Sequence, residues 1–214
     1  MANGRILEWD TPSRFVALAT NILTLPRILT DVLVVFPGLA GETERLQMAI
    51  AEWQNVWDDT NQPKVFLVAQ GWRDYFDFHR LQSPPFNLER IEGVYIQKEP
   101  ARNTKVQADW VVNHPEVAQT KGLTLCATPY HIIRCYLTLL KSWLKNGREP
   151  IFIVPSTTPI SPFAPIPELA SEGADGWSMT AGEVKRILTY QEMGDVATFK
   201  EAEAYLRWYW AWYQ

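Results

Sequence analysis

The chain has 214 residues, of which 47% are hydrophobic and 21% are charged, and its formal net charge is -4 at pH 7. This composition is ordinary for a globular protein and fits one domain of α/β size. The small net negative charge argues against nucleic-acid binding as the main function. No apolar run reaches the ~18 residues that a membrane span needs, so we expect no transmembrane helix.

The N-terminal region contains an apolar patch from Phe15 to Leu25, which Thr20, Asn21 and Thr24 interrupt. It lacks the basic start and the small-residue cleavage site of a signal peptide. We expect this patch to form a helix that packs on a sheet.

Five short β-rich runs follow, and helical stretches separate them. The runs are 31–36, 64–69, 93–97, 123–127 and 150–155, and the helical stretches are 42–57, 104–112 and 131–145. Most runs are continuously apolar, which is typical of strands buried on both faces. The alternation predicts right-handed βαβ units, and therefore an α/β, Rossmann-like, doubly wound parallel sheet of five strands. Strand order 3-2-1-4-5 is preferred, and it sets strands one and four side by side at the switch point; order 2-1-3-4-5, which would bring the loop of Glu99 closer to Pro37, is the alternative.

The two cysteines, Cys126 and Cys135, fall in the fourth run and in the helical stretch after it. Their neighbours are apolar, so they resemble small buried hydrophobic residues rather than a disulfide or a metal-binding pair. His79 and His114 show no metal-ligand spacing either, and we expect no structural metal. The cysteine usage predicts a cytoplasmic protein.

The C-terminal third departs from the strand–helix rhythm. Residues 155–181 carry five prolines, and the aromatic residues in this segment favour an ordered loop over a disordered one. Two helices are then expected, at 181–193 and 198–212, divided by Gly194. We expect this C-terminal helical extension, about residues 180–213, to pack on a core of about 28–160, so that residues 1–214 form a single domain.

The chain ends in a dense aromatic tail, Trp208–Tyr213. Such a tail fits a contact surface for a partner, and it fits equally well a terminal helix that packs on its own domain. The sequence does not predict the oligomeric state.

Ligands of open parallel sheets bind beyond the carboxyl ends of the strands, where the strand order reverses. After the first strand, the Pro37-Gly38 turn allows close backbone approach, and Arg45 lies in reach of an anion. After the third strand, Glu99 places a carboxylate at this edge. Asn103 or Thr104 follows, and capping of the next helix would explain either residue.

The fourth strand is followed by Thr-Pro-Tyr-His, where Thr128 is expected as the N-cap and Pro129 as the first helical residue. His131 and Arg134 are three apart and therefore share a helix face. Two cationic groups beside a helix N-terminus are unfavourable unless an anion compensates them. Glu99 or a ligand is expected to supply that charge.

The order and spacing of these motifs resemble the SanA/ElyC/YdcF family of Rossmann-like proteins. The residues that carry the resemblance are Thr128-x-x-His131-x-x-Arg134, Glu99-x-x-x-Asn103-Thr104, the Pro37-Gly38 turn with Arg45 and Ala49, and Glu183-x-x-Arg186-Ile187-x-x-Tyr190-x-x-x-Gly194. Of the Ser-Gly-Gly turn frequent in that family, only Gly71 is kept. The resemblance spans about residues 31–205 and implies a Rossmann-like fold with a nucleotide-like or S-adenosylmethionine-like ligand.

We therefore expect a site for a small anionic, phosphate-bearing molecule at the carboxyl ends of the strands. His131 is the candidate general acid or base because its ordinary pKa lies near neutral, and Glu99 would orient it. The ligand-binding candidates are Pro37, Gly38, Arg45, Gly71, Asn103, Thr104, Thr128, Tyr130 and Arg134. The reaction could be hydrolysis or group transfer; a non-enzymatic binding, regulatory or protein-interaction role is the alternative.

Overall fold

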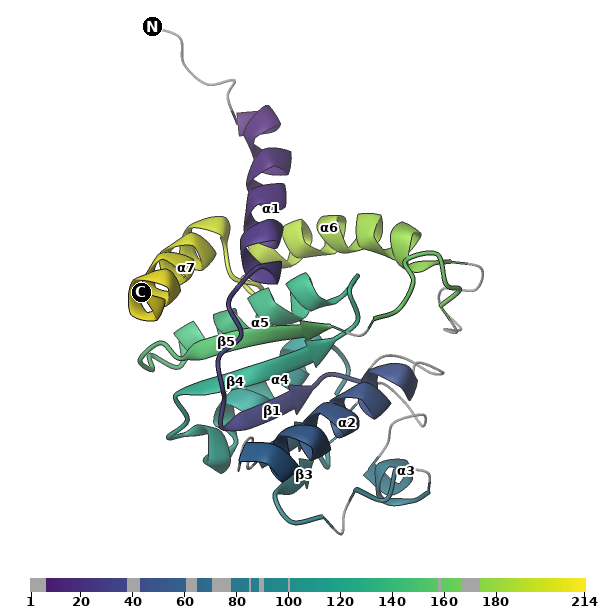
Figure 1. Cartoon of the computed structure of the whole chain (residues 1–214). Helices are drawn as coiled ribbons and strands as arrows, with labels where there is room; N and C mark the ends of the chain where they lie inside the picture. Colours follow the sequence, from purple (N-terminus) through teal and green to yellow (C-terminus); the bar gives the residue numbers. More distant parts are fainter. Residues whose placement is uncertain are drawn as a thin grey trace, which may run out of the picture.

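The structure is a computed structural model, and it describes residues 7–37, 43–60, 65–70, 78–84, 86–88, 91–99, 101–157, 159–166 and 174–214. Five parallel strands form one sheet in the order β3-β2-β1-β4-β5 (Figure 1). They are β1 (Val32–Val35), β2 (Val65–Val68), β3 (Val94–Ile96), β4 (Gly122–Ala127) and β5 (Phe152–Thr157). The preferred order is confirmed. Strands β2 and β3 lie on one side of β1 and strands β4 and β5 on the other, so the strand order reverses between β1 and β4.

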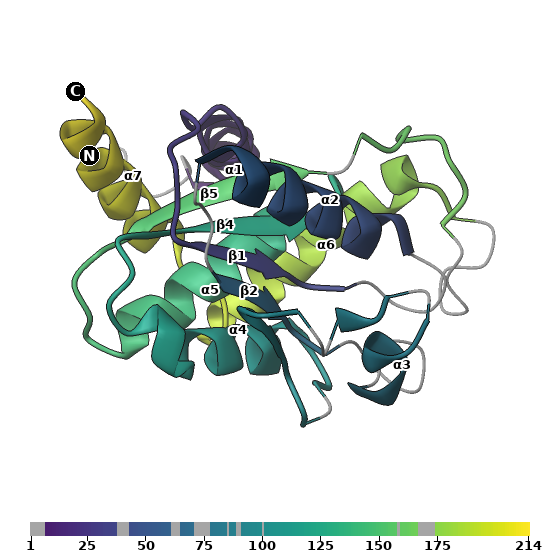
Figure 2. The ribbon, with the colours of Figure 1, turned by 60° about the horizontal axis from the view of Figure 1, so that its bottom comes forward.

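Helices cover both faces of the sheet (Figures 1 and 2). One face packs against α2 (Thr43–Thr60), while α4 (Thr104–Asn113) and α5 (Ile132–Lys145) pack on the other. The short helix α3 (Phe78–Gln82) lies at the end of the molecule that holds β3, away from β5 (Figure 1). Together these layers form the expected α/β Rossmann-like fold.

Alternate residues of β1, β2 and β4 enter two separate hydrophobic clusters. In β1, Leu33 and Val35 pack with residues of α2, whereas Val32 and Val34 pack with residues of α4 and α5. All four are buried. Burial on both faces explains why the strand sequences are continuously apolar.

The start of α5 differs from the expectation. Thr128 is not its N-cap and Pro129 is not its first helical residue, since α5 begins at Ile132. Residues 128–131 form a separate turn, in which the carbonyl of Thr128 accepts from the amides of His131 and Ile132, both at 2.9 Å. The hydroxyl of Thr128 instead accepts from Arg45. The N-cap is His131, whose side chain makes no capping hydrogen bond.

Two helices end the chain, α6 (Gly176–Glu192) and α7 (Phe199–Tyr213). Helix α6 begins five residues earlier than expected, since the side chain of Asp175 accepts from the amide of Ser178 as an N-cap. The amide of Trp177 also donates to the carbonyl of Pro162 at 2.8 Å, which holds the proline-containing segment against the first turn of α6.

The N-terminal helix α1 (Leu7–Leu23) packs against α7, and its first turns extend away from the sheet (Figure 1). Leu18 and Ile22, near its end, are buried and join the larger hydrophobic cluster. The expected helix is therefore present, with α7 as its main helical neighbour.

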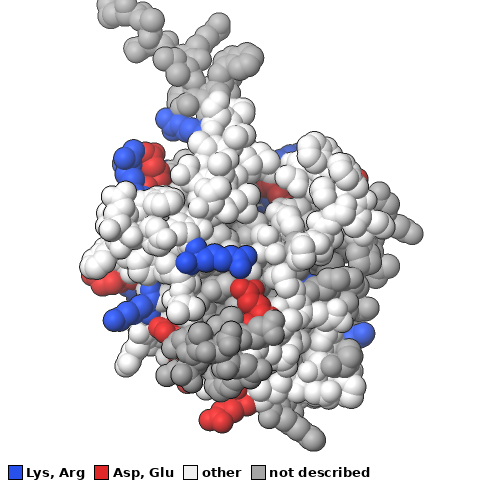
Figure 3. Space-filling view, in the orientation of Figure 1, with Lys and Arg blue, Asp and Glu red and all other residues white. Residues whose placement is uncertain are grey.

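Within the described residues, no helix is both long and apolar enough to cross a membrane. On the face shown in Figure 3, basic and acidic groups are scattered, and no continuous basic patch covers it.

Candidate functional site

Arg45, from the first turn of α2, joins the ends of β1 and β4 at the point where the strand order reverses. Its side chain is 1% exposed. Nη1 donates to the carbonyl of Phe36 at 2.7 Å and lies 3.3 Å from Nδ1 of His131. Nη2 donates to Oγ1 of Thr128 at 2.7 Å and to the hydroxyl of Tyr130 at 3.4 Å. One guanidinium thus fixes the loop after β4 relative to the end of β1.

The contacts of His131 define its tautomer. A guanidinium has no acceptor, so Nδ1 must carry a lone pair that accepts from Arg45. The ring proton is then on Nε2, which donates to Oγ1 of Thr104 at 3.4 Å. Burial lowers the pKa of His131 well below its ordinary value, and three nearby guanidinium groups, those of Arg134, Arg45 and Arg186, lower it further. His131 is therefore neutral at pH 7.

Arg134 of α5 forms a two-point ion pair with Glu183 of α6, through Nε to Oε2 and through Nη2 to Oε1 at 3.2 Å. Its third nitrogen, Nη1, donates to Oγ1 of Thr104 at 2.8 Å. Arg186 also contacts Glu183, with Nη1 at 2.6 Å from Oε1. The side chains of Arg134 and Glu183 are 15% and 4% exposed, whereas that of Arg186 is 45% exposed. A single buried carboxylate therefore serves two guanidinium groups.

The carboxylate that compensates the cationic pair is Glu183 rather than Glu99. Glu99 is exposed and lines a separate depression beside β3 with Trp110 and His114. Glu183 belongs to the C-terminal pattern of the family resemblance, but its separation from Arg134 gave no reason to include it in the site. Only the packing of α6 on α5 brings the two together.

The other expected residues divide into three groups. Thr104, Thr128, Tyr130, His131, Arg45 and Arg134 are brought together in one cluster of contacts. Asn103 caps α4, because its side chain accepts from the amide of Val106 at 3.0 Å, and Pro37 is buried just after β1. Gly38 and Gly71 lie outside the described residues.

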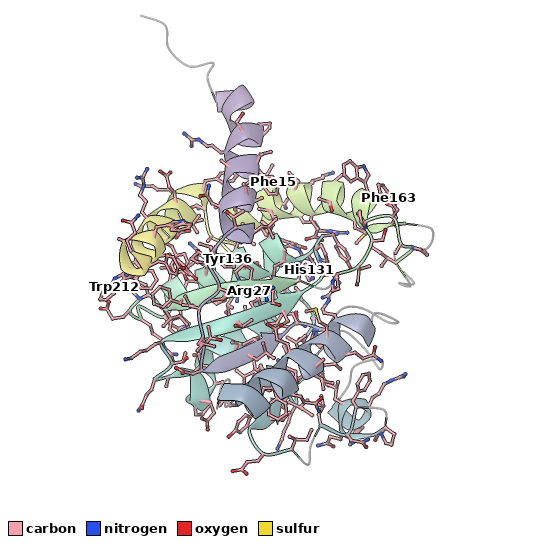
Figure 4. The ribbon with its side chains drawn as sticks, in the orientation of Figure 1. Phe15, Arg27, His131, Tyr136, Phe163 and Trp212 are labelled. Carbon is pink, nitrogen blue, oxygen red and sulfur yellow. The ribbon has the colours of Figure 1, made fainter. Side chains whose placement is uncertain are left out.

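A cavity of about 240 Å³ adjoins the cluster through Thr128 and Tyr130, which line both. Pro129 also lines it, and the rest of its wall comes from the segment after β5 and the start of α6: Ile160, Ser161, Pro162, Ala164, Pro165, Ile166, Gly176 and Thr180. The wall is mainly apolar. Next to these residues, Phe163 and Trp177 stack on each other with ring centroids 6.3 Å apart, although they are 70% and 68% exposed. Figure 4 shows His131 below α6 and Phe163 on the segment that precedes this helix.

No family model and no curated protein matches the chain. In the described part of the chain, no group of three His, Cys, Asp or Glu side chains is placed to hold a metal ion. The polar groups that do converge on the cluster are guanidinium groups, hydroxyls, a neutral imidazole and the Glu183 carboxylate. Guanidinium groups with hydroxyl donors are the usual protein ligands of phosphate and carboxylate.

Proposed function

We propose that the protein binds an anionic, phosphate-bearing small molecule beside His131, at the carboxyl ends of β1 and β4. The observation that carries this proposal is the sharing of Glu183 between Arg134 and Arg186. The two cations and the one carboxylate leave an excess positive charge, which an anion would neutralise. The site also lies at the switch point of the sheet, where ligands of this fold class bind.

The half-exposed guanidinium of Arg186 is the group best placed to meet an incoming phosphate. Arg45 is nearly buried, and its role is to hold Thr128, Tyr130 and His131 in position. A bound anion would offset the positive charges that depress the pKa of His131. Binding would then raise this pKa and make His131 available as a general acid.

The apolar cavity next to the cluster would take the uncharged part of the ligand. Its size and lining suit a flat ring, and the exposed rings of Phe163 and Trp177 offer stacking surfaces beside it. A nucleotide combines such a ring with phosphate groups. S-adenosylmethionine fits less well, since its sulfonium is positively charged.

A non-enzymatic binding role is the second candidate, and the contacts of His131 favour it. Both ring nitrogens are within hydrogen-bond distance of protein groups, Nδ1 of Arg45 and Nε2 of Thr104. The variant His131→Asn separates the two roles. An enzyme would lose turnover of a bound nucleotide with little loss of affinity, whereas a binding protein would show no turnover before or after the change.

We also propose that the protein works in a reducing compartment such as the cytoplasm. Cys126 and Cys135 are both free and buried. Burial raises the pKa of Cys135 to about 12, so that its thiol stays protonated and unreactive.

The test is a thermal-shift titration with AMP, ATP, inorganic phosphate and S-adenosylmethionine. A ligand at ~100 times its Kd adds about 2.7 kcal/mol to the free energy of unfolding. For a protein of this size, that corresponds to a rise in Tm of roughly 5–10 °C.

The informative variant is Arg186→Ala, because this residue is half-exposed and its loss should spare the fold. Loss of a charge-assisted contact should weaken nucleotide binding about tenfold or more. Arg207→Ala is the matched control, since Arg207 is an exposed arginine on α7 that also pairs with one glutamate. The proposal fails if no phosphate compound raises the Tm, or if Arg186→Ala binds the nucleotide as tightly as the parent and the Arg207→Ala control do.

A further inference from the structure

A second cavity, of about 220 Å³, lies over β4 and β5 on the face of the sheet where α2 packs. Its floor includes Thr124 of β4 and Ser156 of β5. One wall is Glu52 of α2, and the other is the connection between α1 and β1, which contributes Arg27 and Thr30. Figures 1 and 4 show this connection running across β4 and β5, with Arg27 on it. None of its lining residues is shared with the cavity near His131.

The polarity of this sheet face is unusual. Parallel strands covered on both faces normally carry apolar side chains on each of them. Here the hydroxyls of Thr30 and Thr124 bond to each other at 2.8 Å, and Ser156 donates to Oε2 of Glu52 at 2.8 Å. Cys126, the neighbour of Ser156 across the strand pair, lies with its sulfur 3.5 Å from the same oxygen. These contacts hold the Glu52 carboxylate over the two strands.

Within the described residues, neither the Glu52 carboxylate nor the Arg27 guanidinium is paired with an opposite charge. Both contacts of Glu52 go to Oε2, and none of the described residues bonds to Oε1. Arg27 is exposed and forms no ion pair or hydrogen bond with a described residue. A carboxylate oxygen and a guanidinium thus line one cavity without bonding to each other. Figure 3 shows a basic group next to an acidic one at the centre of this face.

We propose that this cavity binds a small zwitterion, an α-amino acid or a compound with the same ammonium and carboxylate groups. The ammonium would donate to Oε1 of Glu52 and to the hydroxyl oxygens of the floor. The carboxylate would accept from Arg27 in the two-point geometry that guanidinium groups favour. The cavity is smaller than the ~300–1,000 Å³ of pockets for drug-sized ligands, so it suits a molecule of this size.

The proposal is independent of the phosphate site, because it uses other residues and lies on a face of the sheet rather than at the carboxyl ends of its strands. Calorimetric titration should therefore use the full chain with glycine, alanine, serine, glutamate and lysine as probes. Ethylamine and acetate, each carrying one of the two charged groups, are the comparison ligands. We expect at least one amino acid to bind, and both half-ligands to bind at least about tenfold more weakly, since each lacks one charge-assisted contact.

Two variants test the two walls separately. Glu52→Gln keeps the shape of the side chain, and Arg27→Gln alters an exposed residue that should not affect folding. Each should weaken amino-acid binding by about tenfold to a hundredfold, the range for one hydrogen bond to a charged group, while Arg207→Gln on α7 should not change it. The proposal is overturned if no amino acid binds, if either cavity variant binds as tightly as the parent, or if ethylamine binds as well as the amino acids.

Discussion

Arg134 and Glu183 are linked by two hydrogen bonds between α5 and α6, and both side chains are almost removed from solvent. Removing one partner of such a pair leaves a buried charge uncompensated, which typically costs about 3–5 kcal/mol. We therefore expect Glu183→Gln to lower the free energy of unfolding by a few kcal/mol. Urea denaturation followed by circular dichroism measures this loss.

Arg186→Ala provides the comparison for that variant. Arg186 contacts the same carboxylate, but its side chain is 45% exposed, so its loss should cost no more than about 1 kcal/mol. If Glu183→Gln and Arg186→Ala lower the free energy of unfolding equally, Arg134 is not the main partner of Glu183.

His131 should make the protein sensitive to mild acid. Its pKa in the folded protein lies well below the ordinary value of 6.5. Below about pH 6.5 the unfolded chain therefore binds a proton at this residue that the folded chain does not, and stability falls by up to about 1.4 kcal/mol per pH unit. His131→Asn should reduce the loss of stability between pH 7 and pH 5.

Unfolding curves at several pH values measure this effect, and His114→Gln is the companion variant. Burial also lowers the pKa of His114, so this variant should reduce the acid sensitivity as well. If the parent and His131→Asn lose stability equally between pH 7 and pH 5, His131 is not held in its neutral form by the fold.

Much of the fold follows from short-range patterns in the sequence. The five strands, their parallel arrangement and the preferred order were expected from the alternation of apolar runs with helical stretches. Burial on both faces leaves a continuous apolar run, and such a run is readable without knowledge of the tertiary contacts. The sequence predicts the ends of elements less accurately, as the start of α5 shows. There the hydroxyl of Thr128 accepts a hydrogen bond from Arg45, which is distant in sequence, and does not cap the helix.

The site was predictable only in part, for the same physical reason. His131 and Arg134 are three residues apart, so a helical period places them together. Glu183 reaches Arg134 only through the packing of two helices, and no local periodicity encodes that contact. The aromatic tail shows a similar limit: Tyr209 is buried and donates to the carbonyl of Pro26, whereas Trp212 is 70% exposed. Composition alone cannot separate these two residues.

Two glycines of the C-terminal region should respond oppositely to alanine. Gly182 lies inside α6, and among the described residues an added Cβ would meet only Nη1 of Arg186, at 3.9 Å. Gly182→Ala should stabilise the protein by about 0.5–1 kcal/mol, because alanine loses less backbone entropy in a helix. Gly194 follows α6 with a φ of +74°, so Gly194→Ala should destabilise it by about 1–2 kcal/mol. Thermal unfolding of both variants is the measurement, and changes of the same sign would contradict this prediction.

Tyr205 of α7 closes the outer edge of β5 and should be essential to stability. Its hydroxyl donates to the carbonyl of Ile151 at 2.6 Å and accepts from the amide of Ile153 at 2.9 Å. Strand β5 ends the sheet, so these backbone groups have no further strand on that side. Tyr205→Phe keeps the ring but leaves two buried backbone groups without the hydroxyl, at a cost of about 1–3 kcal/mol.

Tyr213→Phe is the matched control for that variant, because Tyr213 is 48% exposed at the end of the same helix. Its loss of a hydroxyl should change the free energy of unfolding by less than about 0.5 kcal/mol. Hydrogen exchange adds a local measure, since the amide of Ile153 should exchange faster in Tyr205→Phe than global destabilisation alone explains. Unchanged protection of that amide, relative to the neighbouring strand β4, would show that the hydroxyl does not hold the edge. Tyr205 would then stabilise the sheet through ring packing alone.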